Sequence, residues 1–76
     1  MKSMVFNILV TCDDGKRDYA IERLKEFQDI KNIQERKNKN ELFAEVQSDD
    51  KDYVTTNVVQ RIQAIEGITD ASIPPM

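Results

Sequence analysis

The chain has 76 residues, a formal net charge of −3 and a sequence pI near 4.8. This length supports a single hydrophobic core, so we expect one domain over residues 1–76. The acidic balance disfavours direct nucleic-acid binding, because phosphate contacts require basic side chains. One cysteine and no histidine exclude an intramolecular disulfide and the usual zinc, copper and haem ligands, so we expect no metal and no cofactor.

The apolar run near the N-terminus is too short to cross a membrane. It covers residues 4–10 and is interrupted by Asn7, whereas a spanning helix needs about 20 apolar residues. The same interruption argues against a secretory signal peptide. We therefore expect a cytoplasmic protein with no membrane partner.

Two strands and a helix are predicted in the first half of the chain. Residues 4–11 form a strand with apolar side chains on both faces, which is typical of a central strand. A helix follows, with Asp13 or Asp14 as its N-cap, and should end near residues 27–28. Residues 30–37 form a weaker strand whose charged side chains suit the edge of a sheet. The buried face of the helix is expected to hold Ala20, Ile21, Leu24 and Phe27.

The clearest strand pattern lies just past the middle of the chain, over residues 42–48. Leu42, Ala44 and Val46 alternate there with a mixed set of residues, as in a strand with one buried face. Residues 38–40, Asn-Lys-Asn, are the turn before this strand, since asparagine tolerates positive φ. This turn predicts a hairpin with the preceding edge strand.

A second helix is predicted over residues 51–66, with its N-cap supplied by residues 48–50. Gly67 is expected to be its left-handed C-cap. Residues 68–73 form the last strand, which ends at the prolines 74–75 because proline cannot donate to a ladder. The buried face of this helix is expected to hold Val54, Val58, Val59, Ile62 and Ile65.

The two halves of the chain repeat one pattern. Residues 23–30 correspond to residues 61–68 at an offset of 38, and each half reads strand, helix, strand. Two such halves predict an α+β, ferredoxin-like βαββαβ sandwich. We expect a four-stranded antiparallel sheet in the order 4-1-3-2, with two helices on one face.

The face of the sheet that the helices leave open is expected to be a dimer interface. It carries enough apolar side chains to favour packing against a second copy. The alternative is a set of scattered surface apolar residues, which are common. The expected interface residues are Val5, Asn7, Leu9, Phe43 and Glu45, with Thr11 and Gln47 beside them.

Candidate chemistry is sparse, and we expect no enzymatic activity. Acidic residues cluster at 13–18 and 49–52, where helix capping is favoured over cation binding. Cys12 lacks the second cysteine of a soft-metal site, because Gly15 occupies that position. Arg17 lies near the place of the phosphate-cradling arginine of an acylphosphatase-like site, but Glu45 and Gln47 occupy the strand positions where an asparagine would be needed, and no histidine is available as a base. RNA binding is disfavoured because Phe43 is the only aromatic residue expected on the open face.

Two stretches resemble a known family. Residues 5–11, followed by Asp14-Gly15-Lys16, resemble the opening of the ligand-sensing (RAM-type) domain of the leucine-responsive regulator/AsnC family. Residues 58–72 are similar to its closing helix and strand. The family's Gly-x-Tyr-Asp motif before the third strand reads Asn-Lys-Asn-Glu here, at residues 38–41.

The resemblance implies a stand-alone sensing domain of transcription regulation, without the DNA-binding helix-turn-helix. Such domains dimerise through their sheets and assemble into larger oligomers. An amino-acid-like effector then binds between dimers and shifts the assembly state. A DNA-binding regulator of the same family is a further candidate partner. By position, the ligand-binding residues would be Asn38, Asn40, Glu41, Thr69 and Asp70.

Two other families remain open as alternatives. The chain is similar to the periplasmic nitrate reductase maturation chaperones, which share the Gly-Ile-x-x-Ala-Ser ending found here at residues 67–72. That resemblance implies capture of a basic twin-arginine signal peptide, for which Glu45 is a suitable partner. The ACT-type amino-acid-binding domain is the third possibility. Stable self-association without peptide affinity would favour the sensor, and a monomer with an open face would favour the chaperone.

Overall fold

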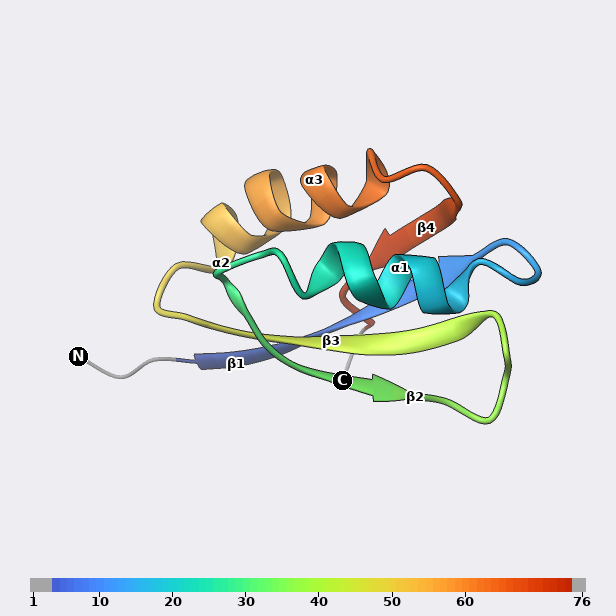
Figure 1. The fold of residues 1–76 in the computed structure, drawn as a ribbon. Helices are drawn as coiled ribbons and strands as arrows, with labels where there is room; N and C mark the ends of the chain where they lie inside the picture. Colours follow the sequence, from blue (N-terminus) through green and yellow to red (C-terminus); the bar gives the residue numbers. More distant parts are fainter. Residues whose placement is uncertain (1–3, 75–76) are drawn as a thin grey trace.

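The computed structural model describes residues 4–74 and shows an α+β fold (Figure 1). Two helical segments pack on one face of a four-stranded antiparallel sheet, which confirms the predicted α+β class. The strands are β1 (Met4–Cys12), β2 (Ile30–Glu35), β3 (Glu41–Ser48) and β4 (Ile68–Ser72). The helices are α1 (Arg17–Leu24) and a continuous segment formed by α2 (Lys51–Tyr53), η1 (Val54–Val58) and α3 (Val59–Gln63).

The sheet has the strand order β2-β3-β1-β4, and all neighbouring strands are antiparallel. β1 and β3 pair along nearly their whole length, from Met4 opposite Ser48 to Thr11 opposite Glu41. β4 is shorter than predicted and pairs only with the second half of β1, up to Leu9 opposite Ser72. The first half of β1 therefore has a ladder partner on one side only within residues 4–74.

The core lies between the sheet and the helices, and the alternation read from the sequence is confirmed. In the two central strands, Ile8, Val10, Leu42, Ala44 and Val46 are fully buried. Full burial of one such aliphatic side chain stabilises the fold by about 1.5–3 kcal/mol. The helices contribute Ala20, Leu24, Val54, Val58, Val59 and Ile62 to the same core, and the turn after α3 contributes Ile65.

The predicted N-cap of the first helix is wrong. The N-cap position of α1 is Lys16, whose side chain makes no capping hydrogen bond. Asp14 Oδ1 instead accepts a hydrogen bond from Asn40 Nδ2 at 2.7 Å, so its carboxylate serves a tertiary contact. α1 also ends earlier than predicted, at Leu24, and Phe27 packs against the core from the following turn.

The turn between β2 and β3 also differs from expectation. Across residues 4–74 only Gly15 and Gly67 have positive φ, so neither Asn38 nor Asn40 adopts the left-handed conformation. Asn38 Oδ1 instead accepts a hydrogen bond from the Asn40 N–H at 2.9 Å. Side-chain bonding to the backbone two residues on is the other way in which asparagine stabilises a turn.

The second helical segment contains a π-helical turn that the sequence pattern did not predict. The Val59 N–H donates to the Val54 carbonyl five residues earlier, so η1 accommodates one extra residue. Val58 and Val59 flank the end of this turn, and both are buried as predicted. The predicted cap is confirmed at the other end, where Asp50 Oδ1 accepts from the Tyr53 N–H at 3.1 Å.

Gly67 adopts positive φ as predicted, at 93°, but it is not the helix C-cap. α3 ends at Gln63 with Ala64 as the C-cap, and Gly67 forms the turn into β4. Its carbonyl accepts a hydrogen bond from the Asp13 N–H at 2.8 Å, which ties this turn to the loop after β1. No helix within residues 4–74 is long and apolar enough to cross a membrane.

Candidate functional site

The five residues predicted to bind a ligand all lie at one end of the sheet. Strand pairing places Glu41 of β3 opposite Thr11 of β1, and Thr11 opposite Asp70 of β4. Asn38 and Asn40 precede β3 directly, so they belong to the same end. Thr69 also lies there, since its Oγ1 donates to the Thr11 carbonyl at 3.2 Å. We call this group of five residues the polar end.

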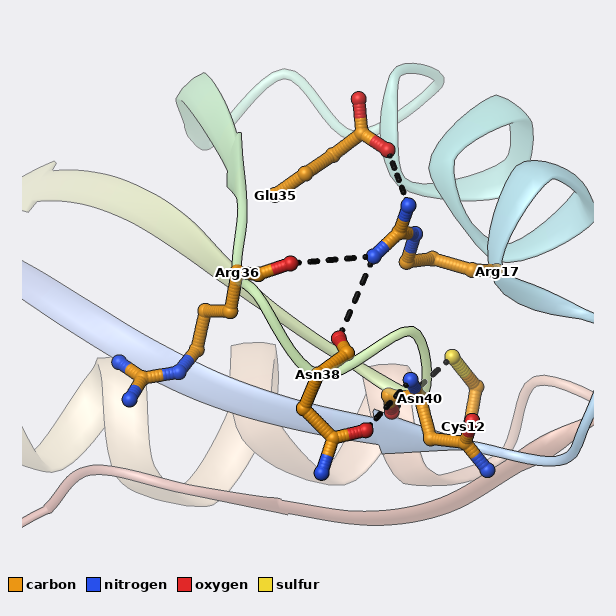
Figure 2. Close-up of polar contacts among 6 residues, drawn as sticks. All are labelled: Cys12, Arg17, Glu35, Arg36, Asn38 and Asn40. Carbon is orange, nitrogen blue, oxygen red and sulfur yellow. Dashed lines mark hydrogen bonds and ion pairs between the residues drawn. The ribbon is translucent and has the colours of Figure 1, made fainter.

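The two asparagines of the polar end are already engaged within the chain (Figure 2). The Asn40 carbonyl accepts from the Cys12 N–H at 2.7 Å and from the Cys12 thiol at 3.3 Å. The Asn40 side-chain amide donates to Asp14, and the Asn40 backbone N–H donates to Asn38 Oδ1. These contacts hold the turn in one conformation against the end of β1.

Arg17 is the residue that organises the other side of this turn. Figure 2 shows its guanidinium between the edge strand and the turn: Nη1 donates to the carbonyls of Arg36 and Asn38 at 3.3 and 3.2 Å. Its Nη2 lies 2.7 Å from Glu35 Oε1, and its side chain is 23% exposed. The Arg17 guanidinium is thus bound within the chain and positions the hairpin turn. These contacts argue against a role for Arg17 in binding phosphate.

Arg36 links the polar end to the open face of the sheet. Its Nε lies 3.3 Å from Glu41 Oε1, and its guanidinium lies 4.7 Å from the centroid of the Phe43 ring. Cation–π contact of this kind is worth about 0.5–1 kcal/mol at an exposed site. Arg36, Glu41 and Asp70 thus place one positive and two negative side chains around the same end of the sheet.

Cys12 is buried beneath the polar end and is 1% exposed. Burial raises the pKa of its thiol above the ordinary range; Arg17 opposes this rise and Asp13 adds to it. A thiol held neutral in this way is a poor nucleophile, because the thiolate is the reactive form. Cys12 therefore acts as a small core residue with a weak S–H donor.

The residues predicted for the dimer interface share the open face of the sheet. Pairing places Leu9 opposite Phe43 and Asn7 opposite Glu45, while the helices cover the other face (Figure 1). Val5 is 56% exposed, and both Leu9 and Phe43 are partly exposed. Apolar and polar rows alternate across this face, so the apolar surface is less continuous than the sequence pattern predicts.

The two acidic clusters lie at opposite ends of the sheet. Asp14 contacts the turn that leads into β3, whereas Asp50 follows the end of β3 and caps α2. Among the described residues, no group of three or more acidic, cysteine or histidine side chains is close enough to hold a metal ion.

A groove of about 1200 Å³ runs along the free edge of β1. We call it the edge groove. Its walls come from the first half of β1, from the second helical segment and from the end of β4 with the residues that follow it, and Phe43 of β3 also lines it. A smaller cleft of about 460 Å³ lies between α1 and β2, and neither cavity is lined by a residue of the polar end. The main edge-groove residues are Val5, Asn7, Lys51, Thr55, Val59 and Pro74.

Neither the groove nor the role of Arg17 was found from the sequence. The groove depends on where β4 stops pairing, and the Arg17 contacts join residues about twenty positions apart. Comparison of the chain with protein-family models, curated proteins and solved structures finds no significant match.

Proposed function

We propose that the chain is a non-catalytic, cytoplasmic domain with a ferredoxin-like fold, related to the ligand-sensing domains of the leucine-responsive regulator/AsnC family. It self-associates through its sheet and responds to an amino-acid-like effector, in partnership with a DNA-binding regulator of the same family. The order β2-β3-β1-β4 supports the fold assignment, because it is 4-1-3-2 counted from the other edge.

The open face of the sheet carries this proposal. Leu9 and Phe43 form a cross-strand apolar pair there, and the exposed Val5 lies on the same face beyond the row of Asn7 and Glu45. A domain of this size buries only about 60% of its unfolded surface, so covering such a face by a second copy adds stability where it is scarce. An isologous pair of sheets is the simplest closed assembly of this kind.

The polar end supplies groups that suit an amino acid. A zwitterionic ligand needs a cation for its carboxylate and an anion for its ammonium group. Arg36 provides the first, while Glu41 and Asp70 provide the second. Because this end is a surface of the single chain, a neighbouring copy supplies the missing wall of the site, and the ligand shifts the assembly through that shared wall.

The test is molar mass in solution for the wild type and two variants. Leu9→Lys places a charge in the centre of the open face, and Gln28→Lys makes a matched charge change on exposed surface beyond α1. We expect the wild type and Gln28→Lys to be dimers or larger, and Leu9→Lys to be a monomer with an unchanged circular dichroism spectrum. If Leu9→Lys keeps the wild-type mass, the sheet is not the interface.

The peptide-binding chaperone is the second candidate, and the partly exposed Glu45 favours it. Glu45 lies on the open face beside Asn7, where a basic peptide would meet a carboxylate. This alternative requires a monomer that binds a twin-arginine peptide and loses that binding in Glu45→Gln. A monomer without such binding would exclude both candidates.

A further inference from the structure

We propose that the edge groove binds one extended peptide, which adds to the free edge of β1 as a strand and places its C-terminal carboxylate near Lys51. The groove shares Val5, Asn7 and Phe43 with the open face, and it shares no residue with the polar end. It does not depend on self-association, and its ligand is a peptide chain rather than an amino acid.

The free edge of β1 is a row of backbone donors and acceptors. In an antiparallel ladder, successive residues direct their N–H and C=O groups alternately to the two neighbours. The Cys12 N–H donates to Asn40, on the β3 side, whereas the Thr11 carbonyl accepts from Thr69 of β4. Every second residue of β1 shares the direction of Thr11. Asn7 and Val5 therefore also direct their backbone groups to the β4 side.

β4 stops before it reaches those groups. Its last pairing is Ser72 with Leu9, and the same register would bring Pro74 opposite Asn7. Proline has no N–H to donate, so the ladder cannot continue in that register. Within residues 4–74, Val5 and Asn7 therefore have no strand pairing on this side, and both line the edge groove.

The helical wall of the groove favours a single peptide strand as its occupant over the sheet edge of a second copy. Thr55 and Val59 of the second helical segment line it. Thr55, Val59, Gln60 and Gln63 of this helix stand along the groove, and a second copy pairing at this edge would have to place its own helical layer beside them. A lone peptide brings no such layer. The groove volume of about 1200 Å³ also exceeds the roughly 300–1,000 Å³ of small-molecule sites.

The direction and chemistry of the peptide follow from its surroundings. A strand that continues the line of β4 runs antiparallel to β1, so its C-terminus lies beside Met4 and Val5. α2 begins at Lys51, just after Ser48, which pairs with Met4. Lys51 is the only charged residue in the described groove lining, and it favours a carboxylate at that end. Alternate peptide side chains meet apolar surface, including Val59, so small β-branched residues fit.

Hydrogen exchange on the isotope-labelled protein tests the proposal. The probe is acetyl-Thr-Val-Thr-Val-Thr-Val with a free C-terminal carboxylate. We expect slower amide exchange at Val5 and Asn7 when it binds, and little change at Phe6, whose N–H already points to β3. A probe with an amidated C-terminus should bind about tenfold more weakly, the scale of one hydrogen bond to a charged group.

Backbone and protein variants separate strand addition from loose apolar contact. N-methylation of the probe residues that face β1 should abolish binding, and N-methylation of the alternate residues should preserve it. Thr55→Trp fills the groove and should prevent binding. Asn57→Trp, on the exposed side of the same helix and outside the groove lining, should not.

Three outcomes would overturn the proposal. These are no saturable binding up to about 1 mM probe, equal binding of both N-methylated probes, and exchange protection confined to Leu9 and Phe43. The same titration on Leu9→Lys keeps the result distinct from the proposed function, because Leu9 does not line the groove. Binding should survive there even though self-association is lost.

Discussion

The Arg17 guanidinium donates a hydrogen bond to the Asn38 carbonyl, 3.2 Å away, and so fastens the start of α1 to the turn between β2 and β3. A second bond from the same nitrogen reaches the Arg36 carbonyl, and Glu35 pairs with the other nitrogen. Contacts from both α1 and β1 thus hold the turn that carries Asn38 and Asn40 of the polar end.

Removing this contact should lower the stability of the fold. We expect Arg17→Ala to reduce the free energy of unfolding by about 1.5–3 kcal/mol, since hydrogen bonds to charged groups contribute on this scale. Urea unfolding at constant pH measures the change. Arg23→Ala, at an exposed position of α1, is the matched control and should stay within about 0.5 kcal/mol of wild type. Equal effects of the two substitutions would refute the positioning role of Arg17.

The two glycines with positive φ should differ in their tolerance of a side chain. Gly67 has φ of 93°, and a Cβ there would lie 3.3 Å from Lys16 Cβ. Gly15 has φ of 76°, but a Cβ would meet nothing within 4 Å. The left-handed conformation alone costs about 1–2 kcal/mol for an alanine. We therefore expect Gly67→Ala to lower the thermal midpoint more than Gly15→Ala, and the reverse order would contradict the contact with Lys16.

The N-cap of the second helical segment should contribute measurably to the free energy of unfolding. Asp50→Ala removes the acceptor of the Tyr53 N–H and should cost about 0.5–2 kcal/mol. Asp49→Ala changes the same charge at an exposed neighbour outside the N-cap position and should have a smaller effect. Chemical denaturation of both variants at the same ionic strength compares them directly. A larger loss from Asp49→Ala would show that charge, and not capping, matters here.

The raised pKa of Cys12 predicts a loss of stability at alkaline pH. In the unfolded chain the thiol ionises near its ordinary value, about 8.5, whereas in the fold burial keeps it protonated to higher pH. Above that value the unfolded state binds fewer protons, so the free energy of unfolding falls as pH rises. Unfolding measured from pH 7 to 10 should show this slope in the wild type and a smaller one in Cys12→Ala. Equal slopes would mean that the thiol is not shielded.

Local periodicity predicted the parts of the fold that depend on side-chain burial. Ile8, Ala44 and Val58 are buried because the spacing of apolar residues sets which face of each element meets the core. The burial of Val58 and Val59 was also predicted, but the π-helical turn was not, because apolar spacing does not reveal that the Val59 N–H bonds to the Val54 carbonyl five residues earlier.

Tertiary hydrogen bonds decided the features that the sequence did not reveal. Asp14 is chemically as good an N-cap as Asp50, but α1 starts later than predicted, with Lys16 at the N-cap position, and the Asp14 carboxylate accepts from Asn40 instead. The polar end was anticipated by position along the predicted strands. The edge groove was not, because it depends on the register at which Pro74 ends the pairing of β4.

The most direct test of the proposed function is the molar mass of the wild type by light scattering, from about 1 μM upward, with and without a pool of amino acids. A sensing domain that assembles through its sheet predicts at least twice the protomer mass of 8.8 kDa, with a further shift caused by one amino acid. A mass of one protomer at every concentration would contradict self-association and, with it, the effector site shared between copies.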